Sequence, residues 1–215
     1  MNRLFNRFYN TQGFGPAIKS KQPRAETILY FQNKLPERLL EYWKKYGFCG
    51  WGEGQFWTVN PSDYQELLEL WLEGTELVGK DKYYVIARSA FGVLYVWGEN
   101  SGQSLKIKPN FSMLFPANKA NDLKDKGSEK AIDSFFFIIT KSRIDEVDLN
   151  DYPLFDRALA KLGALEFDEM YGFVPALVLG GENSLQNLQK VKIQEHLYFL
   201  AEVGEKRVMA DIINV

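Results

Sequence analysis

The sequence has few of the residues on which cross-links, metal sites and membrane anchors depend. It contains one cysteine, Cys49, and one histidine, His196, in 215 residues. A single cysteine cannot form an internal disulfide, and one residue of each type is too few for a zinc site. The longest apolar run, residues 135–139, is far shorter than the roughly 20 residues that span a bilayer. Residues 1–7 show no secretory signal, so we expect a cytoplasmic protein without a membrane segment.

Groups that could carry out catalysis are also scarce. Cys49 and His196 could form a dyad only if the fold brought them together, and we expect a packed thiol and a structural histidine instead. The glycine-rich segment 47–54 follows a helix pattern and precedes a strand pattern, which is the reverse of the order in phosphate-binding loops. The acidic segment 145–148 lacks the glycine and the ligand spacing of a calcium loop. We therefore predict no enzyme activity, no cofactor and no metal.

Apolar residues make up 46% of the chain and charged residues 25%, which is the composition of a globular protein. Apolar periodicity and end signals predict helices at residues 36–46, 61–73, 153–162 and 193–203. Runs rich in aromatic and β-branched residues predict strands at 55–59, 83–88, 93–97, 105–108 and 135–140. These elements indicate an α+β fold, in which an antiparallel sheet is flanked by helices on one face.

The distribution of polar residues divides the chain into two sequential modules. Residues 117–131 are rich in lysine and aspartate and poor in large apolar groups, so they form the best candidate for a linker. We predict an N-terminal module at residues 1–116 and a small C-terminal α+β module at 132–215. The basic arm of the first module, residues 1–24, is expected to be either loose or a strand with turns. Two such modules either share one sheet in one globule or pack as separate domains.

The net charge of −2 conceals an uneven distribution of charge. Residues 1–24 carry five basic side chains and no acidic one, whereas residues 144–169 carry eight carboxylates and two basic side chains. The acidic stretch is either a solvated surface or a docking surface for a basic protein. The basic arm could touch phosphates, but without a recognition motif we do not expect nucleic-acid binding.

An ordered series of motifs resembles a known pair of domains. Four segments resemble the GAD-like domain, namely LPERLLEYW (35–43), YGFCGW (46–51), FWTVNP (56–61) and ARSAFG (87–92). Three later segments resemble the small domain that usually follows it, namely YGFVPAL (171–177), LGG (179–181) and EHL (195–197). Glutamate decarboxylase, whose name the domain shares, uses pyridoxal phosphate on a lysine that conventionally follows a histidine. Because His196 precedes Leu197, we expect no such cofactor.

The resemblance implies an immunity protein of bacterial competition. Proteins with this pair of domains are similar to immunity proteins of type VI secretion DNase toxins, which bind the cognate toxin and block its nuclease, and the C-terminal module is thought to make the contact. Carboxylates that imitate phosphates would suit such an inhibitor. We therefore predict a partner-binding surface in the acidic stretch, formed by Asp148, Asp151, Glu166, Asp168 and Glu169, with Tyr171 as an aromatic anchor.

An alternative function remains open at this stage. The same surface could serve a scaffold or regulatory module that binds another cytoplasmic protein, with possible nucleic-acid contact through the basic arm. The identity of the toxin, the affinity and the oligomeric state do not follow from the sequence.

Overall fold

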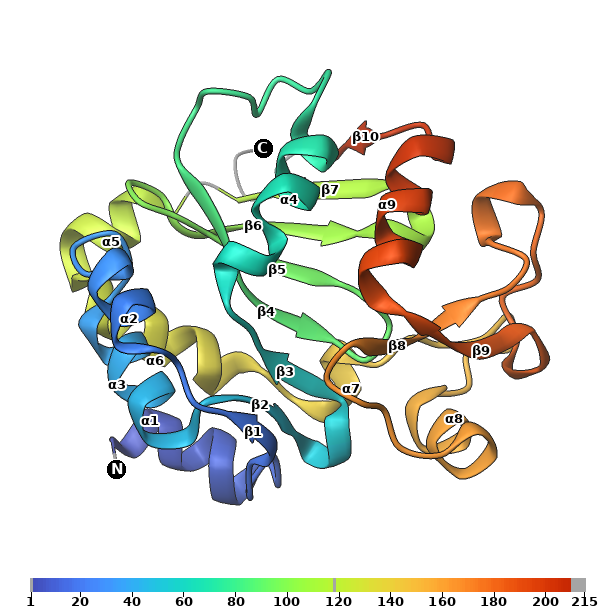
Figure 1. The fold of residues 1–215 in the computed structure, drawn as a ribbon, viewed down its shortest axis with the longest axis horizontal. Helices are drawn as coiled ribbons and strands as arrows, with labels where there is room; N and C mark the ends of the chain where they lie inside the picture. The colour runs from blue at the N-terminus through green and yellow to red at the C-terminus, as the bar shows by residue number, and fades with distance from the viewer. Residues whose placement is uncertain (1, 118, 210–215) are drawn as a thin grey trace.

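The centre of the protein is an eight-stranded sheet. The computed structural model describes residues 2–117 and 119–209, and within them the strands follow one another across the sheet in chain order, apart from the last (Figure 1). Neighbouring strands are antiparallel except β10, which adds to β7 in parallel. The strands are β1 (Ile18–Lys21), β2 (Phe48–Trp51), β3 (Phe56–Thr58), β4 (Tyr83–Ser89), β5 (Leu94–Gly98), β6 (Gly102–Lys108), β7 (Met113–Pro116) and β10 (Arg207–Val208).

Each face of the sheet carries its own hydrophobic core. In β5 the side chains of Leu94 and Val96 enter one core, whereas Tyr95 and Trp97 enter the other. Successive side chains of a strand point to opposite faces, so a strand that is apolar at every position is buried from both sides. The continuous apolar runs in β4 and β5 therefore indicate that other elements must pack on both faces of the sheet.

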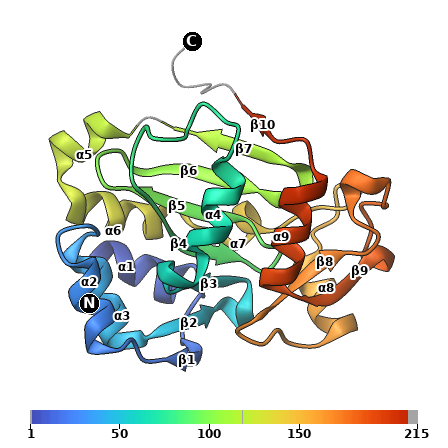
Figure 2. The same ribbon diagram turned by 45° about the horizontal axis from the view of Figure 1, so that its top comes forward.

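The first face is covered by two helices and a separate hairpin. Helix α4 (Gln65–Leu72) follows a 3₁₀ turn (Pro61–Tyr64) whose first backbone groups are capped by the Asn60 side chain. Helix α9 (Ile193–Val203) packs beside α4, and the hairpin of β8 (Glu169–Phe173) and β9 (Leu188–Lys192) leads into it (Figure 2). Helix α8 (Phe155–Leu162) packs against this hairpin.

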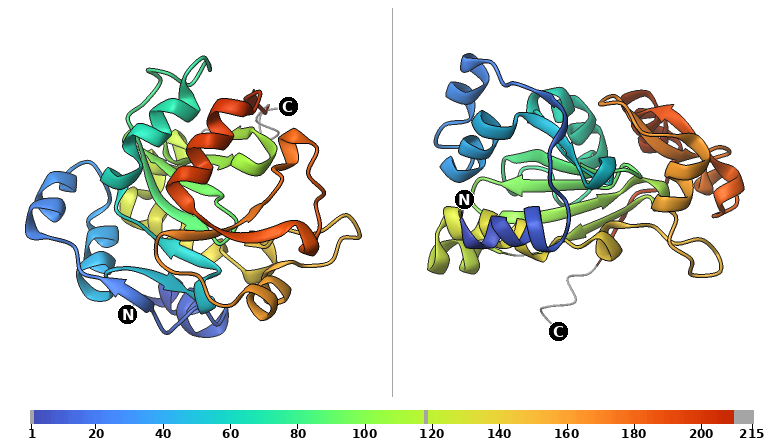
Figure 3. Two further views of the ribbon diagram at one scale, coloured as in Figure 1. Left: turned by 45° about the vertical axis from the view of Figure 1, so that its right-hand side comes forward. Right: turned by 90° about the horizontal axis from the view of Figure 1, so that it is seen from below.

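The second core is mainly aromatic and includes both early and late segments of the chain. It contains α1 (Arg3–Asn6), a π-helical turn (Arg7–Thr11), α2 (Ala25–Phe31), α3 (Glu37–Tyr46) and α6 (Ser128–Ile138). The rings of Phe5, Phe8 and Phe136 meet there at centroid distances of 5.2–5.5 Å. Helices α1 and α6 lie on the side of the sheet opposite α4, as the view from below shows (Figure 3). Two short helices, α5 (Ala120–Lys126) and α7 (Lys141–Ile144), flank α6.

The α+β fold and its antiparallel sheet are confirmed, but three details predicted from the sequence are wrong. Helices lie on both faces of the sheet, because both faces of β3–β5 are apolar. For residues 1–24 the loose arm is wrong, since Phe5, Phe8 and Phe14 are fully buried, and the alternative of a strand is found in β1. Residues 135–138 end a helix rather than begin a strand, because Ile132, Phe135 and Phe136 share one buried helical face.

The segment expected to be a linker, residues 117–131, contains α5 and the start of α6. In α6 the Glu129 carboxylate accepts hydrogen bonds from the backbone N–H groups of Glu37 (3.0 Å) and Arg38 (2.7 Å). These N–H groups lie in the first turn of α3 and have no partner within that helix, so a helix late in the chain caps an early one. Together with the pairing of β10 to β7, this cap joins the two halves of the chain around one sheet. Among the described residues, no helix is long and apolar enough to cross a membrane.

Candidate functional site

The two residues that could have formed a nucleophilic dyad lie in different layers. Cys49 is fully buried in the aromatic core, and its Sγ lies 3.5 Å from the Thr58 hydroxyl. Burial raises the pKa of the Cys49 thiol to about 12, so the thiol stays neutral. His196 lies on α9, which covers the opposite face, and burial lowers its pKa. Within the described part of the chain, no group of three His, Cys, Asp or Glu side chains could hold a metal ion.

The predicted contact residues Glu166, Asp168 and Glu169 are engaged within the protein. Glu166 forms an ion pair with Lys19, Asp168 one of 2.6 Å with Lys192, and Glu169 one of 3.5 Å with Lys190. The Lys192 ammonium holds the pKa of Asp168 below its usual range. Glu166 and Asp168 remain at the surface, but their charge is offset by the neighbouring cations. We call residues 166–169 the paired segment.

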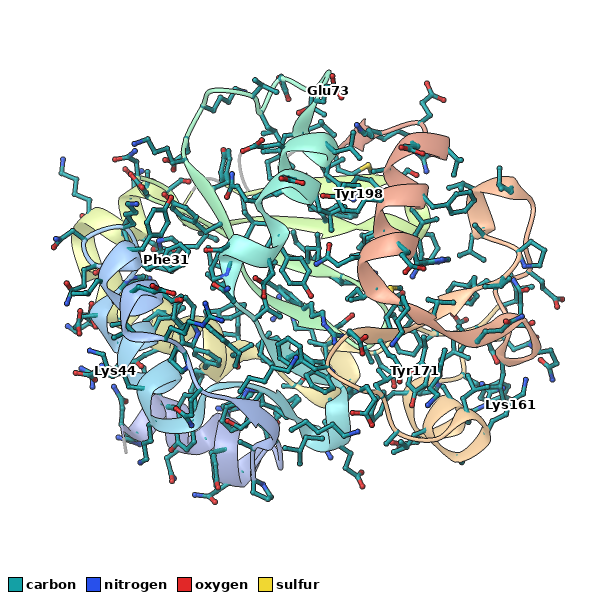
Figure 4. The ribbon with its side chains drawn as sticks, viewed as in Figure 1. Phe31, Lys44, Glu73, Lys161, Tyr171 and Tyr198 are labelled. Carbon is teal, nitrogen blue, oxygen red and sulfur yellow. The ribbon has the colours of Figure 1, made fainter. Side chains whose placement is uncertain are left out.

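Tyr171, expected to be an exposed aromatic anchor, is a core residue (Figure 4). Its ring packs near those of Phe91 and Phe155, at centroid distances of 5.8 and 6.2 Å. Its hydroxyl donates a hydrogen bond of 2.8 Å to the Gly163 carbonyl. A fully buried side chain cannot touch a partner, so Tyr171 stabilises the packing of β8 rather than a contact surface.

Asp148 also has a structural role, in the loop of residues 145–154 that joins α7 to α8. Its Oδ1 accepts hydrogen bonds from the N–H groups of Asn150 (2.9 Å) and Tyr152 (3.1 Å). Its Oδ2 accepts one of 2.6 Å from Arg157 on α8. This ion pair lowers the pKa of Asp148, which is almost completely buried. We call residues 145–154 the ordered loop, because Asp148 organises its turn from inside.

The first residues of the ordered loop are held from both sides. The Asp145 Oδ1 atom accepts a hydrogen bond of 2.9 Å from the Phe155 N–H, in the first turn of α8. Burial raises the pKa of Asp145 to about 6 despite this hydrogen bond. The next carboxylate, Glu146, is buried and forms an ion pair of 3.2 Å with Lys108 of β6. The loop is therefore attached both to α8 and to the central sheet.

Apolar side chains project from the ordered loop into solvent. Leu149 is 67% exposed, Tyr152 63% exposed, and Val147 also belongs to the exposed apolar residues. Asp151 at the tip of the loop and Asp156 just after it are exposed, and within the described residues neither carboxylate has an ion-pair partner. Exposed apolar side chains that gather in one place mark binding surfaces more often than scattered ones do.

A second loop, residues 174–187 between β8 and β9, lies against the first at the end of the molecule opposite α2 and α3 (Figures 1 and 3). The Asn183 carbonyl accepts a hydrogen bond of 3.0 Å from the Leu149 N–H, and the Asn183 Nδ2 donates one of 3.0 Å to the Val147 carbonyl. The same loop carries the exposed side chains of Val174 and Leu179. The candidate functional site is therefore the ordered loop, with exposed Leu149 and Tyr152, unpaired Asp151 and Asp156, and this supporting loop.

Of the predicted site residues, only Asp151 lies on this surface with a free carboxylate. The sequence analysis missed Leu149, Tyr152 and Asp156. The available signal was the placing of two large apolar residues on either side of the Asn150-Asp151 turn, where a polar turn needs neither. The number of charges along the chain does not reveal this surface, because buried, paired and free carboxylates carry the same formal charge.

The ARSAFG motif joins the two halves of the chain rather than forming a site. The Arg88 guanidinium, fully buried, donates a hydrogen bond of 2.8 Å to the Phe167 carbonyl. The Ala90 carbonyl accepts one of 2.9 Å from the Tyr171 N–H. Gly92 has a φ of +78°, and a Cβ there would meet side-chain atoms of β8 and α9 at 2.7–3.0 Å. The motif thus holds the paired segment and the β8–β9 hairpin against the sheet.

Comparisons with known proteins place these two halves in two families. The family model of the GAD-like domain matches residues 4–110, and the model described as "T6SS immunity protein Tdi1, C-terminal" matches residues 129–204. No curated protein matches the sequence significantly. The crystal structure of Atu4351 from Agrobacterium tumefaciens is similar, with a TM-score of 0.83 at 21% identity over 97% of this chain and 91% of that one. At this identity the likeness supports the fold. The chain therefore belongs to the proteins that carry a GAD-like domain followed by the C-terminal domain of the T6SS immunity protein Tdi1.

Proposed function

We propose that this protein neutralises a cognate toxin of a type VI secretion system by binding it through the ordered loop. The toxin is a DNase, and the bound loop occludes its active site in the cytoplasm, where the DNA lies. The observation that carries the proposal is the combination of exposed apolar side chains and free carboxylates on a loop that is already held in shape. This loop lies inside the region that matches the Tdi1 C-terminal family.

The shape of the loop supports tight binding. Asp148 fixes the turn, and Glu146 attaches the loop to Lys108. Asn183 holds the loop backbone at Val147 and Leu149. A loop that is ordered before binding loses little conformational entropy when it binds. Tyrosine and leucine side chains that enter a partner's groove from such a support can make the central contacts of an interface, which are usually few.

The charge of the loop supports a nuclease as the partner. A nuclease must carry a positively charged groove for the phosphates of its substrate, and free carboxylates complement such a groove. Asp151 precedes Tyr152 in the ordered loop, and Asp156 follows at the start of α8, so we expect apolar contact and charge attraction to act on one surface. An inhibitor of this kind covers the groove without any chemistry of its own.

Co-expression tests the proposal. The open reading frame next to the gene is induced in bacteria with and without this protein, and survival, DNA integrity on a gel and co-purification are measured. The variant Leu149→Arg/Tyr152→Ser is expected to lose protection and to weaken binding by at least about 100-fold, as expected for central interface side chains. Survival with a stable wild-type complex and loss of both in the variant supports the proposal.

The molecule offers a matched control on the surface of α2, at the end opposite the ordered loop. Leu29 and Tyr30 on α2 are 65% and 57% exposed, so Leu29→Arg/Tyr30→Ser makes the same chemical change on another surface. This control is expected to protect cells as well as the wild type does. Equal loss of protection in the two variants, or full protection by the loop variant, would overturn the assignment of the loop. A neighbouring protein that is harmless or leaves DNA intact would overturn the DNase proposal.

A further inference from the structure

A cavity of about 450 Å³ is lined by strands β5, β6 and β7 of the sheet and by helices α6 and α7. Its walls come from Tyr95 of β5, Lys106 of β6, Phe115 of β7, Phe135 and Ile138 of α6, and Arg143 of α7. These strands are neighbours, and Lys106 stands opposite both Tyr95 and Phe115 in the register of the sheet. A cavity of this size is within the range of small-molecule sites.

The cavity is positively charged. Lys106 is only partly exposed, and Arg143 stands at the rim. Within the part of the chain that the structure describes, neither side chain has a carboxylate partner or a hydrogen bond. The nearest carboxylate, Glu146, is already paired with Lys108. Burial and then the neighbouring charges of Lys108 and Arg143 lower the pKa of Lys106, and the Glu146 carboxylate opposes this shift only in part.

The floor of the cavity is apolar. Phe135 belongs to the buried aromatic core, whereas Ile138 is one of the exposed large apolar side chains of the molecule. The Lys106 Nζ atom lies 5.0 Å from the centre of the Phe115 ring, so the cation stands beside an apolar wall. A second hollow of about 210 Å³ is also lined by Phe135 and Ile138. An apolar group therefore has room to extend along α6.

We propose that this cavity binds a small amphipathic anion, whose carboxylate or phosphate head pairs with Lys106 and Arg143 and whose apolar body lies on Phe115, Phe135 and Ile138. Lys106 and Arg143 line the same cavity as Phe115, Phe135 and Ile138, which matches a ligand with a charged head and an apolar body. An anion there supplies the partner that these cations lack inside the protein. The site is separate from the ordered loop and does not depend on the proposed function.

Calorimetric titration of the full-length protein with four probes tests the site. Octanoate and octyl phosphate carry the head and the body together, 1-octanol carries the body alone, and inorganic phosphate carries the head alone. The first two are expected to bind with one-site stoichiometry, and the last two at least about tenfold more weakly. Comparison of octanoate with octyl phosphate distinguishes the two kinds of head.

Variants decide whether the bound probe occupies this cavity. Lys106→Met and Arg143→Gln are each expected to weaken the better anion at least about tenfold. The exposed Lys130 on the same helix α6 supplies the matched control Lys130→Met, which is expected to bind like the wild type. Thermal unfolding shows whether each variant is folded. If Lys106→Met does not fold, Arg143→Gln still tests the proposal. Equal binding by wild type and both variants, equal binding of 1-octanol, or no binding of either anion overturns the proposal.

Discussion

The two ends of the acidic stretch behave differently, although both carry several carboxylates. In the paired segment, Glu166, Asp168 and Glu169 each have a lysine partner, and Arg88 holds the backbone at Phe167. In the ordered loop, the buried carboxylates of Glu146 and Asp148 have cation partners, whereas Asp151 and the following Asp156 are free. We therefore expect a carboxylate to contribute to recognition only where the fold has left it without a partner.

The difference also assigns separate tasks to the two ends. The paired segment connects the β8–β9 hairpin to the sheet, and the ordered loop presents Leu149 and Tyr152 to solvent. Changes in the paired segment are therefore expected to alter stability, and changes on the exposed surface of the loop to alter binding.

The largest expected effect comes from the residue that fastens the paired segment. Arg88→Met removes a buried hydrogen bond to the Phe167 carbonyl and leaves that carbonyl without a donor. We expect a loss of about 3 kcal/mol in the free energy of unfolding, or roughly 6–12 °C in the melting temperature. Thermal and denaturant unfolding measure both quantities. The exposed Arg24 supplies the control Arg24→Met, which is expected to melt like the wild type, and a similar loss in the control would contradict this role of Arg88.

The next effect concerns binding alone. Asp151→Asn/Asp156→Asn removes one exposed carboxylate from the ordered loop and one from the start of α8, and asparagine tolerates the φ of +61° at position 151. We expect the rate of association with the toxin to fall by about 3- to 10-fold at low salt, and the difference to shrink at 0.5 M salt through screening. Stopped-flow or surface-based kinetics measure this rate. A reduction that is independent of salt would show that these carboxylates do not act through charge attraction.

A smaller effect is expected in the dependence of stability on pH. Burial raises the pKa of Asp145 to about 6 in the folded protein, from the 3.8 of an unperturbed aspartate in the unfolded chain. The folded state therefore favours the neutral form. The stability that this preference contributes is present below pH 4 and is lost as the pH rises through 6. Asp145→Asn keeps the oxygen that accepts from Phe155 and removes the titration. Relative to wild type, the variant is expected to gain about 1 kcal/mol between pH 4 and pH 7, a value reduced for partial exposure.

Denaturant unfolding at several pH values checks this expectation. Other titrating groups are common to both proteins and cancel in the difference between them. A difference that stays constant from pH 4 to pH 7 would contradict the raised pKa of Asp145.

The smallest effect is expected from the exposed ion pair of the paired segment. Asp168→Asn removes the pair with Lys192, which lowers the pKa of Asp168 and so stabilises the fold above the pKa of the unfolded chain. The variant is expected to lose slightly in stability at pH 7, and this loss is expected to shrink as the pH falls below the pKa of the unfolded chain, the opposite direction to Asp145→Asn. Its affinity for the toxin is expected to stay unchanged. An affinity loss as large as that of the Asp151/Asp156 variant would remove the distinction between the two ends.

Much of the local structure could be predicted from the sequence. Pro36 and Gly47 mark the ends of α3, Asn60 caps the turn before α4, and the continuous apolar runs of β4 and β5 form two of the predicted strands. These signals act over a few residues, so they work without knowledge of the rest of the chain. The prediction failed at residues 135–138, where a short apolar run suits either a strand or a buried helix.

The candidate site was only partly predictable. Asp151 was identified, but Tyr171 and Asp148 were assigned to a surface from which packing removes them. Tyr171 is buried because Phe91, about 80 residues earlier, packs near it in the same hydrophobic core. Neither its residue type nor its neighbours in sequence indicate that contact.

The sequence by itself determined the absence of a disulfide, the main helices and strands, and the resemblance to the two domains, because each depends on composition or on short ordered motifs. Only the tertiary structure decided which carboxylates are free and that both halves of the chain complete one sheet. The physical reason is the distance between partners along the chain. Lys19 neutralises Glu166, and Glu129 caps α3 at Glu37, so the charge and the cap exist only after distant segments have packed together.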